Sequence, residues 1–263
     1  MTIFHKAMIA GACEIVKAEK DDPGFSCVLF EPDGTIIARS QYAIFVAQPT
    51  LEKVARSLPF PSDKKLVQPI AISLDQLISF LRSIPADRQF KGLLEHISLS
   101  PDVNGKVRGD IVDGKGTKHN FMRISQPKPA LLQWRERMRS LSLGVGIRDF
   151  VFNRKRIGCV INAIEAACKY DGEFSYIVQK PFEGGYIWRC LNELTGQNVI
   201  VAHAMQASNK PIENTQWEET LYAKVNSNNH GNGIATAGRI HRVSRVVPIG
   251  GMPAGASPAN GKS

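Results

Sequence analysis

The segment from Asn153 to Met205 shows the clearest change of hydrophobic period along the chain. From Asn153 to about Tyr170, apolar residues recur at helical spacing. Three shorter runs with the composition of strands follow at Phe174–Gln179, Tyr186–Leu191 and Asn198–Ala204. The pattern therefore predicts one helix followed by three strands. The residues expected to face the core from this helix are Ile157, Val160, Ile161, Ile164 and Cys168.

The N-terminal residues show the same order of periods. Thr2 to about Lys20 predicts a helix capped by Thr2, because its apolar residues fall on one face. Strand-like runs follow at Phe25–Phe30, Thr35–Ala38 and Tyr42–Ala47, separated by turn residues. The inward side chains expected on this helix are Phe4, Met8, Ala12, Ile15 and Val16.

A third stretch repeats the order between these two. Val67–Ile72 predicts a strand and Ser73–Ile84 a helix capped by Ser73. The strand-like runs Leu93–Leu99, Lys106–Val112 and His119–Ile124 come next. A unit of one helix and three strands thus recurs at similar intervals, which indicates an α+β fold built from a structural repeat. The alternative is chance, because mixed chains often contain such runs.

Connectors and a tail account for the remaining sequence. Thr50–Leu66 is one connector, and Ser125–Gly146 is a second that includes a predicted helix, Ala130–Leu143, and leads into a strand at Ile147–Phe152. Asn226–Ser263 is rich in Asn, Gly, Ala, Ser and Pro and contains no Phe, Trp or Tyr, so a disordered tail is expected there. The predicted domains are residues 1–124, with two units, residues 125–207, with one unit, and a low-complexity tail at 208–263.

Charge points to a polyanionic partner. The net charge is +9 and the isoelectric point is about 9.4. Such a balance favours nucleic acid, or less often an anionic membrane surface. The segment Thr220–Ser263 has five basic residues and no acid, so more than half of the excess lies near the C-terminal end.

Cysteine usage and hydropathy indicate the compartment. The five cysteines are odd in number, form no C-x-x-C pair and lie mostly among apolar neighbours, as reduced thiols do. We therefore expect a reducing, cytoplasmic environment. No apolar run approaches the roughly 20 residues of a membrane span, so a soluble protein with no membrane partner is expected.

Motifs for catalysis are missing from the sequence. The six histidines show no spacing typical of metal ligands, and no cysteine has a patterned histidine nearby. Asp113–Lys118 resembles a phosphate-binding loop but lacks the G-x-x-x-x-G-K-[ST] spacing and a following helix, so it predicts a hairpin turn. The sequence predicts a protein without enzymatic activity, metal or cofactor.

Positive charge on helices is the informative chemical feature. Arg154, Lys155 and Arg156 occupy the first turn of a predicted helix, where the helix dipole disfavours cations. A nearby phosphate backbone would explain them, although a solvated basic face is the simpler alternative. Arg135 and Arg139 share one face of another predicted helix. Because no base-reading motif is present, DNA binding should be independent of sequence.

These residues resemble a known family, the DNA sliding clamps that act as replication processivity factors. The helix and strands of Phe4–Ala47, including Phe25–Phe30 and Asp33–Ala38, look like the opening half-domain of a clamp. Val67–Ile124 resembles a second half-domain, and Ile147–Met205 resembles the closing half-domain of a bacterial-type clamp. A clamp subunit with two domains has four half-domains, whereas three are counted here. Ser125–Gly146 should therefore be a reduced unit, or the ring closes differently.

The resemblance implies a homo-oligomeric ring around double-stranded DNA, with helices lining the hole and a surface pocket for peptides of a DNA polymerase or clamp loader. Basic side chains on the helices would contact phosphates. The candidate DNA-binding residues are Lys6, Lys17, Lys20, Arg82, Arg135, Arg139, Arg154, Lys155 and Arg156. Two alternatives stay open: a basic nucleic-acid-binding protein that acts through its tail without forming a ring, and a structural or scaffold protein.

Overall fold

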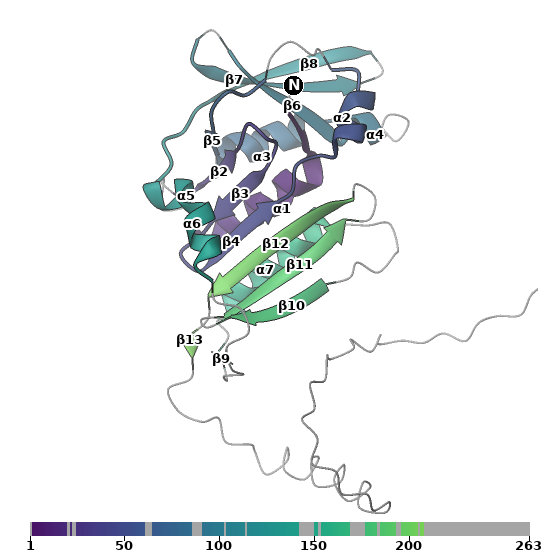
Figure 1. Ribbon diagram of the computed structural model, residues 1–263. Helices are drawn as coiled ribbons and strands as arrows, with labels where there is room; N and C mark the ends of the chain where they lie inside the picture. Colours follow the sequence, from purple (N-terminus) through teal and green to yellow (C-terminus); the bar gives the residue numbers. More distant parts are fainter. Residues whose placement is uncertain are drawn as a thin grey trace, which may run out of the picture. The chain divides into compact units, whose positions relative to one another are not determined.

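Helices and strands follow one order three times in the computed structural model (Figure 1). The structure describes residues 2–19, 22, 25–60, 65–85, 91–102, 104–113, 115–141, 150–151, 154–168, 177–182, 185–192, 196–204 and 206–207. Each repeat is a leading strand, a helix and a meander of three strands. This order confirms the predicted α+β class and the recurrence of helix-plus-three-strand units.

The bounds of these elements define three units. The first unit comprises β1 (Thr2–His5), α1 (Lys6–Val16), β2 (Cys27–Phe30), β3 (Ile36–Arg39) and β4 (Ala43–Ala47). The second comprises β5 (Ile70–Ser73), α3 (Leu74–Ser83), β6 (His96–Pro101), β7 (Lys106–Asp113) and β8 (Gly116–Arg123). The third comprises β9 (Phe150–Val151), α7 (Arg154–Ala167), β10 (Ile177–Phe182), β11 (Gly185–Asn192) and β12 (Gln197–Ala204).

Short elements lie within, between and after the units. They are a 3-10 helix, η1 (Lys17–Glu19), the helices α2 (Glu52–Ser57), α4 (Lys91–Leu94), α5 (Pro129–Leu132) and α6 (Trp134–Arg139), and the strand β13 (Gln206–Ala207). The predicted connector Ser125–Gly146 thus contains two short helices. Its described part, 125–141, has no meander and pairs with the sheets only through the bridge from Ser125 to Ala71. The expectation of a reduced unit there, or of a different ring closure, stays a prediction.

The first two units exchange their leading strands. β1 pairs with β6, so the four-stranded sheet has the order β1-β6-β7-β8. In return, β5 pairs with β2 at the edge of the larger sheet. Each leading strand therefore extends the meander of the other unit, and neither unit can complete its sheet alone.

The third unit joins the first through strand pairing. β12 pairs with β4 in antiparallel register, from Val199 opposite Ala47 to His203 opposite Ala43. The result is a seven-stranded sheet with the order β10-β11-β12-β4-β3-β2-β5. Residues 1–212 accordingly form one compact unit. The domain division expected near residue 125 falls at the connector and stays a prediction.

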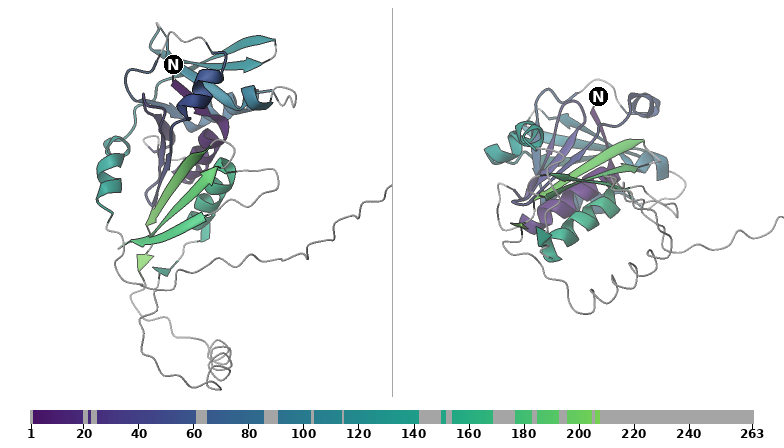
Figure 2. Two further views of the ribbon diagram at one scale, coloured as in Figure 1. Left: turned by 45° about the vertical axis from the view of Figure 1, so that its right-hand side comes forward. Right: turned by 60° about the horizontal axis from the view of Figure 1, so that its bottom comes forward.

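The main hydrophobic core lies under the helices. Successive side chains of a strand point to opposite faces of the sheet, as β2 shows. Val28 and Phe30 face the core that contains α1, α3 and α7, while Cys27 and Leu29 face the opposite side. We call these two sides of the seven-stranded sheet the helix face and the connector face. Figure 2 shows α1 and α7 side by side on the helix face and α5 and α6 on the other side. Complete burial of side chains such as Phe30 contributes roughly 1.5–3 kcal/mol each.

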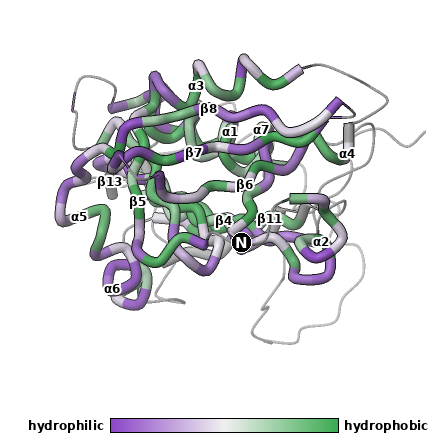
Figure 3. The backbone as a smooth tube through the Cα atoms, turned by 90° about the horizontal axis from the view of Figure 1, so that it is seen from above, coloured by the Kyte–Doolittle hydropathy of each residue, from purple (hydrophilic) through white to green (hydrophobic). Residues whose placement is uncertain are grey.

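Leu131 from α5 and Trp134 from α6 fix the connector on its own face of the sheet. Leu131 is fully buried against Leu29 and Ile37, and Trp134 packs against the same cluster. Figure 3 shows α5 in hydrophobic green and α6 in hydrophilic purple. The connector is thus held by its apolar first turn together with Trp134, and the charged residues of α6 are exposed.

Strand β1 corrects the sequence-based expectation for the N-terminal residues. Thr2–His5 was expected to begin a helix, but these four residues form a buried strand opposite Leu99–His96. The helix begins at Lys6, and the side chain of His5, not that of Thr2, caps it by accepting from the amide of Ala7 at 3.3 Å. The pairing with β6 comes from far along the sequence, so local spacing could not reveal it.

Other boundaries shift less. The predicted helix at Ser73–Ile84 corresponds to α3, but the Ser73 side chain makes no cap hydrogen bond to the backbone. In α7, Ile161 was expected to face the core and is instead 49% exposed. The expected cap Asn153 and the whole of the predicted tail lie outside the described residues.

Candidate nucleic-acid interface and outer groove

The predicted DNA-binding residues fall into two groups on opposite faces of the sheet. Those on the helix face come from α1, η1, α3 and α7, which we call the helix layer. Lys6 opens α1 and is half-buried, while Lys17, Arg82 and Arg154 are exposed. Lys20 and the side chain of Lys155 lie outside the described part of the chain.

Charges on the helix layer are mixed. Glu14 on α1 binds the ammonium group of Lys17, and the exposed acids Asp75 and Glu165 lie on α3 and α7. Because the Lys17–Glu14 pair is exposed, it stabilises the fold little and leaves Lys17 able to exchange partners. The layer can thus contact phosphates through single side chains rather than through a uniformly basic patch.

Arg156 is engaged within the fold. Its guanidinium carbon lies 3.1 Å from the centre of the Tyr42 ring, in a cation–π contact between α7 and the start of β4. Its positive charge also adds to the effect of burial in lowering the pKa of His203 to about 4. A packing role therefore accounts for Arg156 at this helix end, and its predicted phosphate contact stays a prediction.

Arg135 and Arg139 lie on α6, on the connector face. The Arg135 guanidinium binds Glu31 at 3.0 Å and Asp33 at 3.6 Å and stacks on Trp134 at 4.5 Å from the ring centre. Trp134 also donates its indole N–H to Glu31 at 3.0 Å. Arg135 thus fastens the connector to the β2–β3 turn. The structure does not bring Arg135 and Arg139 together with the basic residues of the helix layer.

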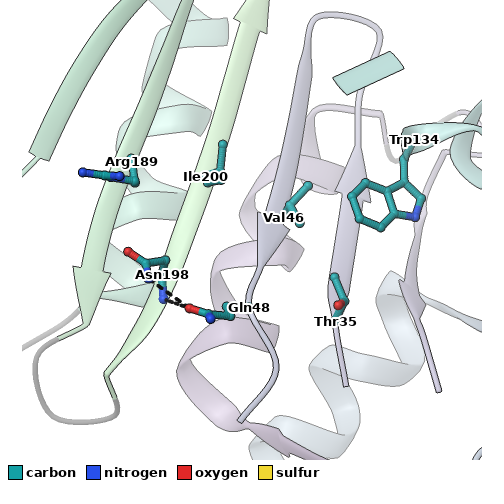
Figure 4. Close-up of a pocket in the computed structure, with 7 residues that line it drawn as sticks. All are labelled: Thr35, Val46, Gln48, Trp134, Arg189, Asn198 and Ile200. Carbon is teal, nitrogen blue, oxygen red and sulfur yellow. Dashed lines mark hydrogen bonds between the residues drawn. The ribbon is translucent and has the colours of Figure 1, made fainter. Parts of the chain in front are cut away.

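A groove on the connector face was not found by sequence reasoning. It has a volume of about 400 Å³ and runs across β3, β4, β12 and β11 beside α6 (Figure 4). The residues that line it are Thr35, Val46, Gln48, Trp134, Arg189, Asn198 and Ile200. They come from five separate parts of the sequence, which the β4–β12 pairing and the docking of the connector bring together.

The groove is apolar at its centre and polar at one end. Val46 and Ile200 are opposite each other across the β4–β12 pair, and Trp134 forms a wall on the connector side. Gln48 Oε1 accepts hydrogen bonds from the amide and the side chain of Asn198 at 3.0 and 2.9 Å, which fixes the polar end (Figure 4). Arg189 is exposed and supplies a positive charge beside the apolar centre. This arrangement suits a peptide with apolar and acidic side chains.

Metal and membrane sites find no support within the described residues. No three His, Cys, Asp or Glu side chains gather there as they would around a metal ion. In the same part of the chain, no helix has the length and apolar character of a membrane span. None of the five cysteines, all of which lie within the described residues, forms a disulfide, and four of them are buried.

Comparison with known proteins gives similarities in structure. No protein family matches this chain by sequence profile, and no curated protein matches it in sequence. A putative DNA polymerase III beta subunit from Eubacterium rectale has a TM-score of 0.44 at 10% identity, covering 84% of this chain and 67% of that chain.

Two further solved structures are similar to the same extent. The PCNA2–PCNA3 complex from Sulfolobus tokodaii has a TM-score of 0.45 at 10% identity over 79% of this chain and 99% of that chain. Proliferating cellular nuclear antigen from Entamoeba histolytica has a TM-score of 0.43 at 11% identity over 78% of this chain and 98% of that chain.

Proposed function

We propose that this protein is a sliding-clamp-like processivity factor that binds double-stranded DNA through its helix layer and binds a replication protein through the groove on its connector face. In this proposal it performs no catalysis, needs no cofactor and works in the cytoplasm. The proposal includes the domains predicted from the sequence, in which the first domain contains two units and the second contains one.

The observation that carries the proposal is the separation of the two faces. Within residues 1–212, α1, α3 and α7 lie in one layer against the sheets, and α1 contacts both of the other helices. The opposite face holds the connector and the groove. A protein of this build can bind a polyanion on one side while a peptide occupies the other.

Ring formation is the part of the proposal that the sheet edges support. Among the described strands, β1 and β8 end the four-stranded sheet and β10 ends the seven-stranded sheet without a further partner strand, whereas the edge at β5 is bridged by Ser125. Free edges are sites where another chain can add strands. Because these edges belong to both sheets, each sheet has a place where a further subunit can join, as a closed assembly requires.

The decisive experiment combines mass in solution with retention on DNA. We expect an oligomer that stays on closed circular DNA and is lost from the same DNA after linearisation, because a ring leaves DNA only at a free end. A monomer that dissociates equally from circles and linear DNA would contradict the proposal.

A second candidate function is nucleic-acid binding through the basic C-terminal segment without a ring. The five uncompensated cations in Thr220–Ser263 favour it, together with the mixed charge of the helix layer. Deletion of Asn226–Ser263 separates the two functions. The clamp proposal expects assembly and retention on circles to persist, whereas binding through the tail expects most of the affinity and the salt dependence to disappear.

A further inference from the structure

Strands β7 and β8 lie side by side at one edge of the four-stranded sheet (Figure 1). Val107 and Met122 face the core, and a Cβ built on Gly109 would lie 2.9 Å from Cζ of Phe80 in α3. The alternate residues therefore point to the side of the sheet away from the helices. They form three facing pairs: Lys106 with Arg123, Arg108 with Phe121, and Asp110 with His119. We call these six residues the hairpin face.

Phe121 is exposed on a side of the sheet where another apolar side chain is covered. Val112 points to the same side from β7 and is only 7% exposed, because it packs with Ile3 and Phe60. Phe121 is 57% exposed. A flat aromatic ring that is open to solvent on a sheet offers a surface on which a nucleobase can stack.

The charges beside Phe121 favour an anion. Lys106 and Arg123 lie directly opposite each other and are both exposed. Like charges in facing positions destabilise a sheet. Neither side chain forms an ion pair with any residue that the structure describes. A phosphate group bound between them would remove this repulsion, so the pair indicates a place for one.

Asp110 orients the remaining side chains of the hairpin face. Its carboxylate is almost fully buried, binds the Arg108 guanidinium at 3.0 Å and lies 2.7 Å from Nδ1 of His119. Both side chains are thus held in place before any ligand binds. With three permanent cations and this one acid, the hairpin face keeps a net charge of +2 when His119 is neutral.

We propose that the hairpin face binds a single strand of nucleic acid, with a base stacked on Phe121 and phosphates beside Arg108 and between Lys106 and Arg123. Successive pairs on one face of a strand are about 7 Å apart, so one nucleotide can reach both the ring and the cations. The bases of a duplex are already stacked on each other, and only an unpaired strand can use the exposed ring. Stacking tolerates every base, so binding is independent of sequence.

This site is separate from the two surfaces of the proposed function. Helix α3 packs on the other side of the same sheet, as the contact of Gly109 with Phe80 shows. The groove lies on the seven-stranded sheet. Binding of a single strand therefore requires neither a ring nor a peptide partner.

The test is the affinity of the full-length chain for a fluorescein-labelled oligothymidylate of about 20 nucleotides, measured by fluorescence anisotropy. Phe121→Ala removes the stacking surface and should raise the Kd about tenfold, whereas Phe121→Trp keeps a ring and should bind at least as tightly. The control is Val67→Ala, which truncates a side chain that is 85% exposed outside the hairpin face and should leave the Kd unchanged. The same dependence on Phe121 with an oligouridylate would extend the site to RNA.

Lys106→Ala combined with Arg123→Ala tests the phosphate contacts. The slope of log K against log salt for the oligothymidylate should fall by up to about 1.4, because two phosphates lose their cations. The affinity of this variant for a duplex of equal length should be unchanged, since the helix layer is intact. A chain that fails to stay on circular DNA can still show this loss, so the two proposals fail separately.

Cross-linking locates the bound strand. Ultraviolet light joins thymine to the side chains that it contacts, and mass spectrometry of the digested protein should find the adduct in the β8 peptide. The thermal transition of each variant checks that it is folded. An unaltered Kd of Phe121→Ala for the oligothymidylate, or adducts confined to peptides outside β7 and β8, would overturn the proposal.

Discussion

Gly11 of α1 lies against the backbone of α7 at Ala163. A Cβ built on Gly11 would be 2.6 Å from the Ala163 carbonyl oxygen and 2.8 Å from Cβ of Ala167. No real Cβ tolerates such a distance from a backbone atom, so the absence of a side chain at Gly11 sets the spacing of the two helices. The third unit can join the first only at this spacing.

Replacing Gly11 with valine should therefore destabilise the protein. The added side chain forces α1 and α7 apart, and overpacking of this kind costs about 1–3 kcal/mol in free energy of unfolding. Urea denaturation followed by circular dichroism measures the loss. The control is Gly92→Ala in α4, where an added Cβ meets nothing within 4 Å and stability should be unchanged or slightly higher. Equal stability of Gly11→Val and the unaltered protein would contradict this account of the helix contact.

Acid should destabilise the fold through His203. Burial, with a smaller effect from the charge of Arg156, lowers the pKa of His203 from 6.5 to about 4. Between these two pKa values the unfolded chain binds a proton that the folded chain does not. The free energy of unfolding therefore increases with pH across this window. As pH falls from about 6.5 towards 4, it decreases by on the order of 3 kcal/mol.

Denaturation curves at several pH values test this prediction. His203→Leu removes the titrating group and should flatten the dependence on pH over the window. Burial also lowers the pKa of His96, so part of the dependence should remain in the variant. The same slope in the variant and the unaltered chain would show that His203 is not the group responsible.

Charges on the two faces should contribute unequally to DNA binding. Lys17→Ala combined with Arg82→Ala removes two exposed cations from the helix layer. If both contact phosphates, the slope of log K against log salt should fall by up to about 2, and affinity should fall on every DNA sequence alike. Fluorescence anisotropy with a labelled duplex at several salt concentrations measures both quantities.

The matched control removes the same charge from the connector face. Arg137→Ala combined with Arg139→Ala changes two exposed cations on α6 and should leave the slope unchanged. If the two double variants lose equal affinity, the helix layer has no special part in binding.

The groove should bind peptides with apolar and acidic residues. Ile200→Gln replaces an apolar side chain on its floor and should raise the Kd about tenfold, since burial of such a side chain contributes roughly 1.5 kcal/mol or more. The probe is a fluorescein-labelled hexapeptide containing Leu, Phe and Asp. Val67→Gln, at an exposed position before β5 and outside the groove, is the control and should bind like the unaltered protein. Binding of the probe that neither substitution alters would place it elsewhere on the molecule.

The sequence by itself determined the elements whose stabilising contacts are local. Helices α3 and α7 follow from apolar residues at helical spacing, and the meanders follow from alternating runs bounded by turns. The three repeated units could also be predicted, because each unit has its own pattern of hydrophobic residues. The basic character of several helix positions could also be predicted, although Arg156 proved to be packed on Tyr42.

Only the tertiary structure decided how these units combine. Whether Thr2–His5 is helix or strand depends on pairing with β6, and the face on which Arg135 lies depends on Leu131 docking against β2 and β3. The groove exists because β4 pairs with β12, and the exposed Ile161 is visible only once α7 has packed on α1. Each of these depends on residues far apart along the chain, whose contacts leave no periodic trace in the sequence.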